Sequence, residues 1–510
     1  MAAEIELRFR VGPGILDRLR QATPDGVTDV RPVVTRTLSS TYFDLPDRSL
    51  GSRGFGIRLR VEDGQRSLTI KADDGHGWFG ARREWVAAQA GAVPRLGRLG
   101  RHLPPEASAG PLSPVFRTRI ERTLRDLRIG RAARVELALD RGVIYAGRHR
   151  RAVREIEIEL KRGAVMDLYA VALRLHRDFG PFALMPSSKA VRGYALAAGR
   201  PEAARRADAV AIDVGASTEA ACKAILRSCL GQILANHEPA RLGKDSEGVH
   251  QIRIGLRRLR TALSSLRPFL PPERRQPVAA WARWATRHFG PARDWDVFID
   301  ERLAPALARI GDGDPGVHLR TAAQAERAAA YRLARRALRA ARYTEAMLDA
   351  LQWLEEPWNE AVGKRRRQRL ATPFVDIAWR LMRDADRRLR ARANNLDEGD
   401  PAVLHAVRLA AKKARYMAEF LAPIAPPGGV EPYVKALKRV QDTFGRSSDD
   451  TVAADRLTTL LSAVRVDAPQ TLIDAITPPA DPTRARLRLR SAWRAYEATM
   501  PLHRALGHHT

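Results

Sequence analysis

The sequence predicts an α+β protein of two domains, a β-rich domain followed by an all-helical domain. In residues 1–160, apolar and charged residues alternate in several short segments, as in β-strands. From about residue 217 onward, apolar residues recur every three or four positions, as in helices. The helical part also repeats a set of basic residues at a constant spacing, which indicates duplication of a whole helical unit.

The alternating segments are separated by Gly, Pro and Asp, which favours antiparallel hairpins. They are EIELRFRV, FGIRLRV, SLTIKA, ARREWVA, ARVELALD and REIEIELK. Residues 199–216 have no firm period and form the predicted linker. We therefore place the β-rich domain at 1–198 and the helical domain at 217–505, with repeats at about 217–345 and 372–500, each a bundle of about four helices.

Composition limits the classes of partner. The chain has 510 residues and a net charge of +30, so it attracts polyanions such as nucleic acid, anionic membranes or polyphosphate. The sequence contains no apolar run of the ~20 residues that a membrane helix needs, and its charged start is unlike a signal peptide. We expect a cytoplasmic protein that does not bind membranes. Two cysteines, Cys222 and Cys229, are expected to be buried free thiols.

Alternation gathers charged residues on one face of several predicted strands. These charged sets are Glu4, Glu6, Arg8 and Arg10; Arg58 and Arg60; and Glu155, Glu157 and Glu159. A sheet whose charged face meets water would show the same pattern. Like charges placed so closely repel unless counter-ions neutralise them. Carboxylate clusters suit Mg²⁺ or Mn²⁺, and guanidinium clusters suit phosphate, so a closed barrel with an ionic interior would satisfy both.

The first domain resembles a known family. The opening E-x-E-x-[KR], formed by Glu4, Glu6 and Arg8, is similar to the signature of the CYTH domain, the triphosphate tunnel metalloenzymes. The segments TYFDLPDRSL, FGIRLR, TIK, VELALDRG, EIEIEL and SKAVRGY follow in the family's order over about residues 1–198. The resemblance implies an eight-stranded antiparallel tunnel that hydrolyses inorganic triphosphate with Mg²⁺ or Mn²⁺.

The CYTH resemblance also implies roles for individual residues. The implied metal ligands are Glu4, Glu6, Glu157 and Glu159, with Asp140 as a weaker candidate. The implied triphosphate-binding residues are Arg58, Arg60, Lys71, Arg122 and Lys189, with Arg192 as a secondary candidate. Glu4, Glu6 and Arg8 are the expected catalytic residues. Arg8 replaces the family's lysine, and a planar guanidinium is not a compact ammonium, so the catalytic rate is the property that this change affects.

The helical domain has a basic helix face that occurs twice. The first copy comprises His250, Arg253, Arg257, Arg258 and Arg260, and the second comprises His405, Arg408, Lys412, Lys413 and Arg415. At 100° per residue most of these side chains share one face, opposite an apolar stripe. A solvated charged face is the simplest interpretation, but the duplicated register favours polyanion binding. Phe289-Gly290 likewise recurs as Phe444-Gly445.

This half resembles the CHAD domain over about residues 212–505. The likeness is carried by the histidine helix, by FGPARDWDV and by KKARYMAEF. It implies binding of inorganic polyphosphate along a basic surface formed by both repeats. The repeats differ at RSSDD, where the RDWD of the first copy is only partly kept.

The predicted function is therefore a metal-dependent inorganic triphosphatase or short-chain polyphosphatase, whose helical domain binds polyphosphate and associates it with polyphosphate granules. The alternative is a non-catalytic polyphosphate-binding protein. A specific nucleic-acid binder is disfavoured because aromatic residues make up only 6% and do not interleave with the basic faces. Adenylate cyclase activity, which occurs in some CYTH relatives, is a fourth hypothesis.

Overall fold

The computed structural model divides into two compact units. It describes residues 5–23, 26–73, 82–105, 110–130, 133–243, 246–310, 314–360, 362–394, 400–464, 470–477 and 482–507. The first unit comprises residues 1–205, 231–252 and 335–356, and the second comprises 206–230, 253–334 and 357–510. The first unit thus includes two segments of the predicted helical domain.

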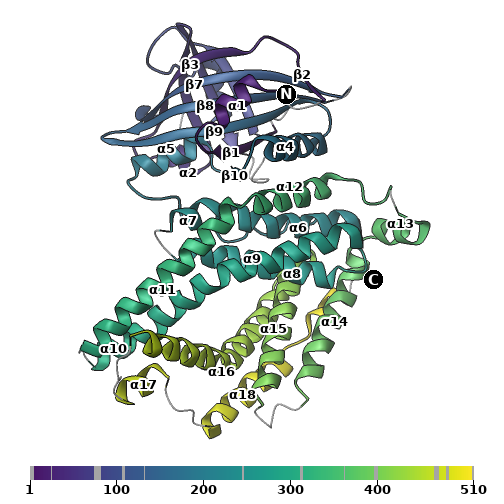
Figure 1. Ribbon diagram of the computed structural model, residues 1–510. Coiled ribbons are helices and arrows are strands. Elements are labelled where there is room, and N and C mark those ends of the chain that lie inside the picture. Colours follow the sequence, from purple (N-terminus) through teal and green to yellow (C-terminus); the bar gives the residue numbers. More distant parts are fainter. Residues whose placement is uncertain are drawn as a thin grey trace. The chain divides into compact units, whose positions relative to one another are not determined.

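The first unit contains a ten-stranded antiparallel sheet in the order β10-β1-β9-β8-β7-β3-β4-β5-β6, with β2 paired to β7 (Figure 1). The strands are β1 (Glu6–Val11), β2 (Val27–Asp29), β3 (Val34–Asp44), β4 (Phe55–Glu62), β5 (Gln65–Asp73), β6 (Arg82–Ala88), β7 (Ser113–Ile129), β8 (Ala133–Ala146), β9 (His149–Arg162) and β10 (Phe182–Leu184). The predicted α+β class with an antiparallel tunnel is confirmed. The described residues form ten strands, whereas the CYTH resemblance implied eight; β2 and β10 have only three residues each.

Helices of the first unit pack against this sheet and against one another. They are α1 (Ile15–Gln21), α2 (Ser49–Ser52), η1 (Gly97–His102), α4 (Val165–Phe179), α5 (Lys189–Ala197), α7 (His237–Leu242) and α12 (Ala341–Glu355). Helix α4 packs against β1, β9 and α12, and α5 packs against β7, β8 and β9. Leu7, Phe9, Ile156 and Ile158 are fully buried on the strands that these helices cover. The apolar core therefore lies outside the tunnel, and the alternating charged side chains face inward.

The second unit is helical. Its helices, including those that continue from the first unit, are α6 (Thr218–Ala235), α8 (Glu247–Ser265), α9 (Pro272–Phe298), η2 (Ile299–Leu303), α10 (Ala304–Ile310), α11 (Asp314–Arg339), α13 (Lys364–Ala371), α14 (Val375–Arg392), α15 (Pro401–Leu421), η4 (Ala422–Ile424), α16 (Val430–Val464), α17 (Gln470–Ile476), α18 (Pro482–Glu497) and α19 (Leu502–Gly507). Helix α15 packs between α14 and α16, and α18 packs on α16. The two histidine segments of the sequence repeat fall in α8 and α15.

Two further sequence expectations concern burial and membranes. Cys222 and Cys229 are buried and unbonded, as predicted, and burial raises the pKa of Cys229 to about 12. Across the described ranges, every helix is too short or too polar to cross a bilayer.

Candidate active site

A cavity of about 620 Å³ lies inside the sheet of the first unit. Its walls come from β1, from β3 through β9, and from the start of α5. Its charged lining residues are Glu6, Arg8, Arg58, Arg60, Lys71, Glu84, Arg122, Glu136, Glu157, Glu159, Lys161 and Lys189. An interior this polar cannot serve as an apolar core, so it suits a charged ligand.

Strand register brings three carboxylates into one row. Glu6 on β1 lies opposite Glu159 on β9, and Glu159 lies opposite Glu136 on β8. Lys161 Nζ is 2.7 Å from Glu159 and 3.6 Å from Glu136. Carboxylate oxygens on adjacent strands are the ligands that Mg²⁺ and Mn²⁺ prefer. These three carboxylates are neighbours across the strands, but within the described ranges only Asp140, Glu155 and Glu157 have oxygens close enough together to share one ion.

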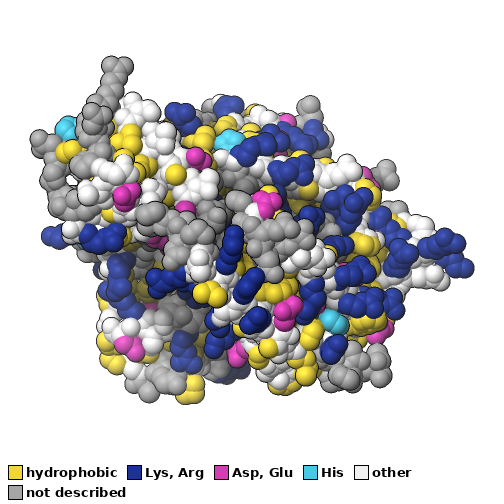
Figure 2. Space-filling view, turned by 90° about the horizontal axis from the view of Figure 1, so that it is seen from below, with side chains coloured by type: hydrophobic (Ala, Val, Ile, Leu, Met, Phe, Trp, Pro, Cys, Tyr) yellow, Lys and Arg dark blue, Asp and Glu magenta, His cyan; other side chains and the backbone are white. Residues whose placement is uncertain are grey.

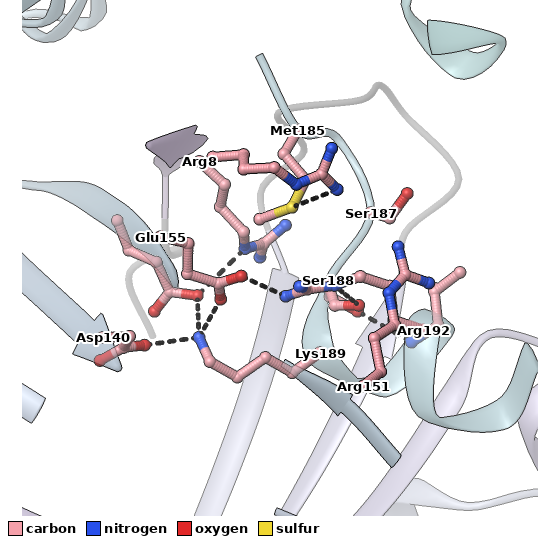
Figure 3. A network of polar contacts seen from close by, with 12 residues as sticks. Arg8, Asp140, Arg151, Glu155, Met185, Ser187, Ser188, Lys189 and Arg192 are labelled. Carbon is pink, nitrogen blue, oxygen red and sulfur yellow. Dashed lines mark hydrogen bonds and ion pairs between the residues drawn. The ribbon is translucent and has the colours of Figure 1, made fainter. Parts of the chain in front are cut away.

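A second acidic group, deeper in the wall, is already neutralised by protein cations (Figure 3). Oxygens of Asp140, Glu155 and Glu157 lie within 4.8 Å of one another. Lys189 Nζ is 2.5 Å from Asp140 and 2.9 Å from Glu157, and it also pairs with Glu155. Arg122 is 2.6 Å from Asp140 and 2.5 Å from Glu157. An ammonium thus occupies the position that a metal would take in this cluster.

The protonation of this network follows from its pairing. Burial alone would raise the pKa of Glu157, but the charges of Lys189 and Arg122 hold it well below its ordinary value. Burial alone would lower the pKa of Lys189, but the surrounding carboxylates raise it. Glu157 and Lys189 are therefore charged near neutral pH, and each depends on its partners to remain so in a buried position.

The opposite wall carries basic residues with fewer acidic partners. On β4 and β5, Arg58 is 3.4 Å and Lys71 is 3.0 Å from Glu84. Arg60 Nε is buried and has no hydrogen-bond partner within the described ranges. Burial lowers the pKa of Arg60 to about 10, and the charges of Arg58 and Arg122 contribute to this. A buried donor crowded by like charges fits a bound anion.

The structure brings most of the sequence-predicted residues together. Those that line the cavity are Glu6, Arg8, Arg58, Arg60, Lys71, Arg122, Glu157, Glu159 and Lys189. Glu4 lies outside the described residues. Arg192 is not part of the lining. Its guanidinium is buried, donates to the backbone oxygen of Ser188 at 3.3 Å and pairs with Glu155, so it supports the wall instead of facing the cavity. Asp140 is likewise fully buried beneath Arg122.

Sequence reasoning did not single out three lining residues, Tyr42, Glu84 and Glu136. The alternation of VELALD contained the signal for Glu136, because residues two positions apart share a face. Tyr42 shows no comparable signal. Burial would raise the pKa of its phenol, but the charges of Arg58, Arg60 and Lys189 lower it below its ordinary value.

In the second unit, arginines of the two sequence repeats repel one another electrostatically. Burial lowers the pKa of Arg257 on α8, and Arg253, Arg408 and Arg415 lower it further by their charge. Two of these belong to α15, so the basic faces of the two repeats are close enough to repel. Figure 2 shows a face of the molecule on which Lys and Arg side chains outnumber acidic ones.

A glycine explains part of the repeated pattern. Arg253 donates to the backbone oxygen of Gly290 and is 2.9 Å from Asp294. In the second repeat, a Cβ on Gly445 would lie 2.9 Å from the Arg408 guanidinium. Each Phe-Gly pair therefore leaves room for the first arginine of its repeat to lie against the neighbouring helix.

The remaining predicted residues of the basic face differ in exposure. Arg260, His405 and Lys413 are exposed, and His250, Lys412 and Arg415 are half-buried. Arg258 is 5% exposed, donates to Ser228 and lies over the ring of Phe420. Its assignment to a binding surface is therefore corrected, because its guanidinium is within the helical packing. The marginal position of Arg258 on the helical wheel is consistent with this.

Two family models match the chain, the CYTH domain over residues 2–194 and the CHAD domain over residues 224–458. A curated relative, inorganic triphosphatase from Haemophilus influenzae, is 32% identical over 202 residues. The alignment covers 38% of this chain, and the chain spans only 55% of that relative's length.

Solved structures of both kinds are also similar. The CHAD domain from the plant Ricinus communis is 30% identical, with a TM-score of 0.47, and the match covers 57% of this chain and 97% of that one. A putative adenylyl cyclase from Hippeastrum, described as having a dominant triphosphatase activity, is 16% identical, with a TM-score of 0.28, over 39% of this chain and 96% of that one.

Proposed function

Because the chain carries a CYTH domain followed by a CHAD domain, we propose that it is a metal-dependent inorganic triphosphatase that also acts on short polyphosphate and binds long polyphosphate through its helical domain. The observation that carries this proposal is the division of the cavity into two walls. One wall holds a row of carboxylates, and the other holds cations that include the buried, unpartnered Nε of Arg60.

Substrate binding is assigned to the basic wall. Arg58, Arg60 and Lys71 would bind the phosphate oxygens, and the buried Nε of Arg60 would gain a hydrogen-bond acceptor that it lacks among the described residues. Arg122 contributes less to binding, since Asp140 and Glu157 already engage it. The anion would remove the repulsion between Arg58 and Arg60 and would be held along the strand pair β4 and β5.

Metal binding is assigned to the row Glu6, Glu159 and Glu136, with Glu4 added from the E-x-E motif. Mg²⁺ or Mn²⁺ bound there supplies charge neutralisation at the phosphate oxygens and lowers the pKa of water. Glu157, which the motif also suggested as a ligand, serves instead to hold Arg8, Arg122 and Lys189 in position.

The reaction is an in-line displacement at the terminal phosphorus. A water oxygen forms the new P–O bond, the bond to the bridging oxygen breaks, and diphosphate leaves with the negative charge that Arg58 and Lys71 stabilise. Arg8 pairs with Glu6 and lies 3.4 Å from Glu157, and its charge contributes to the lowered pKa of Glu157. Because Arg8 has a planar guanidinium where the CYTH signature has a lysine ammonium, we expect triphosphate binding to be retained and the catalytic rate to differ.

The test is phosphate release from inorganic triphosphate by the full chain with Mg²⁺, with Mn²⁺ and with a chelator. We expect release that requires metal, with triphosphate preferred over ATP. If neither metal supports phosphate release while calorimetry still detects triphosphate binding, the protein is a non-catalytic polyphosphate-binding protein. This is the second candidate function because Arg8 replaces the lysine of the CYTH signature. Cyclic AMP formation from ATP would instead support the cyclase hypothesis.

Polyphosphate binding is assigned to α8 and α15. The mutual repulsion of Arg257, Arg253, Arg408 and Arg415 would be relieved by a polyanion that bridges the two helices. Such a surface would hold the enzyme at cytoplasmic polyphosphate granules and raise the local substrate concentration. We expect Arg257→Gln and Arg408→Gln to weaken binding of long polyphosphate, with Arg387→Gln on α14 as a control, since its side chain is 71% exposed. Displacement of polyphosphate by duplex DNA at equal phosphate concentration would contradict this assignment.

A further inference from the structure

A buried carboxylate outside the cavity binds two of the strands that form it. Glu238 on α7 is in the first compact unit, although it lies within the residues matched by the CHAD model. Its side chain is 2% exposed and accepts hydrogen bonds from three arginines. Arg10 donates at 2.8 and 3.0 Å, Arg151 at 2.8 Å, and Arg241 at 3.1 Å to each oxygen.

The protonation state of Glu238 supports this role. Burial alone would raise its pKa, but the hydrogen bond from Arg241 and the charge of Arg10 hold the pKa far below its ordinary value. The carboxylate is therefore ionised at all physiological pH values. A buried ion of this kind persists only where its partners are fixed in place.

Two of the three arginines come from neighbouring strands of the cavity wall. Arg10 is on β1, two residues beyond Arg8, and Arg151 is on β9. The same two strands carry Glu6 and Glu159 into the cavity. Glu238 is thus bonded to both strands that supply the proposed metal ligands, and its hydrogen bonds within the described ranges do not reach the basic strands β4 and β5.

Arg10 and its neighbour on β1, Arg8, also contact the segment that leads to Lys189 (Figure 3). Arg10 lies 3.6 Å from Met185 Sδ, and Arg8 donates to the backbone oxygen of Pro186 at 3.3 Å. Ser188 then caps α5 by accepting a hydrogen bond from the backbone of Val191. The contacts of Glu238 therefore extend by one further step to the start of the helix that presents Lys189 to the acidic group.

We infer that Glu238 is a positioning residue for the cavity: by fixing Arg10 and Arg151 it holds β1 and β9 so that Glu6 and Glu159 stay opposite each other, where a divalent cation could bind both. This inference rests on the proposed function for its catalytic consequence, but its structural part, the placement of the carboxylates, is independent of turnover. It follows that the helical half contributes a residue to the support of the tunnel.

The inference predicts different effects on substrate affinity and on metal affinity. In the proposed function, substrate affinity depends on β4 and β5, to which Glu238 makes no hydrogen bond among the described residues. Metal affinity depends on β1 and β9. We expect Glu238→Gln in the full chain to weaken Mn²⁺ binding and to lower kcat, each by roughly tenfold, as outer-shell changes do. The KM for triphosphate at saturating metal should change much less. Glu238→Asp keeps the negative charge on a shorter side chain, so we expect it to recover only part of the lost Mn²⁺ affinity and kcat.

The controls separate positioning from a general loss of stability. Arg20→Gln removes an ion pair with Glu121 that lies outside the Glu238 network, so it should leave kcat and Mn²⁺ affinity unchanged. If Glu238→Gln does not fold, Arg10→Met and Arg151→Met test the two strand contacts one at a time. Each should reproduce part of the loss in Mn²⁺ affinity.

The experiment is calorimetric titration of Mn²⁺ into each variant without triphosphate, followed by steady-state hydrolysis. Wild-type Mn²⁺ affinity and kcat in a folded Glu238→Gln protein, or in both arginine variants, would overturn the inference. If the wild type binds Mn²⁺ but releases no phosphate, the proposed function fails, and the difference in Mn²⁺ affinity between wild type and Glu238→Gln still decides the inference.

Discussion

Replacing Arg60 by methionine should make the protein more stable and less able to bind triphosphate. Arg60 is half-buried, and its pKa falls from its ordinary value to about 10 because of burial and the neighbouring charges of Arg58 and Arg122. A fall of this size corresponds to roughly 3 kcal/mol against the charged side chain in the folded protein. Since the side chain is charged below the folded pKa, the whole penalty is present at pH 7 and would disappear only as pH rises from about 10 toward 12.5.

Removing the charge should therefore raise the free energy of unfolding by about 1–3 kcal/mol at pH 7, after allowance for partial solvent screening. A hydrogen bond to a charged group contributes about 1.5–3 kcal/mol, so kcat/KM for triphosphate should fall by roughly 10–100-fold. Urea unfolding without ligand gives the first quantity, and phosphate release gives the second.

Arg122→Met is the matched control, because Arg122 donates to Asp140 and Glu157, whereas the buried Nε of Arg60 has no hydrogen-bond acceptor among the described residues. Its removal leaves Asp140 and Glu157 buried without one of their counter-charges, which should lower stability by about 3–5 kcal/mol. The reasoning is refuted if Arg60→Met destabilises the protein as much as Arg122→Met does while kcat/KM stays at the wild-type value.

Three further predictions concern other parts of the molecule. Gly193→Ala should lower the free energy of unfolding by about 1–3 kcal/mol, since the added Cβ would lie 2.1 Å from the Phe116 ring, and an unchanged Tm would contradict this packing. Gly445→Ala should weaken polyphosphate binding without loss of stability, because alanine favours a helix by ~1 kcal/mol and the methyl group displaces only the movable Arg408 guanidinium; unaltered affinity would argue against a role for Arg408. His237→Leu should make the free energy of unfolding depend less on pH in the acid range. Burial lowers the His237 pKa to about 4, so the unfolded chain takes up a proton near pH 6.5 before the folded chain does. As the pH falls toward 4, the wild type should therefore lose about 3 kcal/mol of unfolding free energy that the variant keeps. Parallel urea-unfolding stabilities of the two proteins from pH 7 to 4.5 would rule this out.

Strand periodicity predicted which face of a strand a side chain is on, but not how far along the strand that face lines the cavity, since Arg10 shares the face of Arg8 and is not in the lining. Because side chains alternate along a strand, EIELRFRV alone predicts that Glu6 and Arg8 share a face opposite Leu7 and Phe9. The structure puts the first pair in the cavity lining and buries the second pair completely. The helical period similarly predicted the apolar face of α8, where Ile252, Leu256 and Leu259 are buried.

Periodicity could not predict which charged residues pair with one another. Arg192 and Arg258 have the same sequence character as residues of the basic surfaces, yet each is buried against a partner, Glu155 and Ser228 respectively. These pairs depend on how a helix packs after the chain has folded, and no local pattern records that. The contact of Arg10 with Glu238 joins positions that are 228 residues apart, so neither segment alone predicts it.

The strand count shows a second limit. Alternation needs several residues to become visible, so the three-residue strands β2 and β10 have no signal of their own. Strand β10 is nevertheless important, since it pairs with β1 along Phe9, Arg10 and Val11 and leads to the segment that precedes Lys189. Its formation depends on the edge that β1 presents and not on local propensity.

The most direct measurement is Mn²⁺-dependent phosphate release from triphosphate by the wild type, by Glu6→Gln and by Glu159→Gln, with the exposed Arg20→Gln as a control. The two carboxylates lie opposite each other across β1 and β9. We predict that both glutamine variants lose nearly all activity while remaining folded and still binding triphosphate through the basic wall. Full activity in either variant would contradict a catalytic metal held by the carboxylate row.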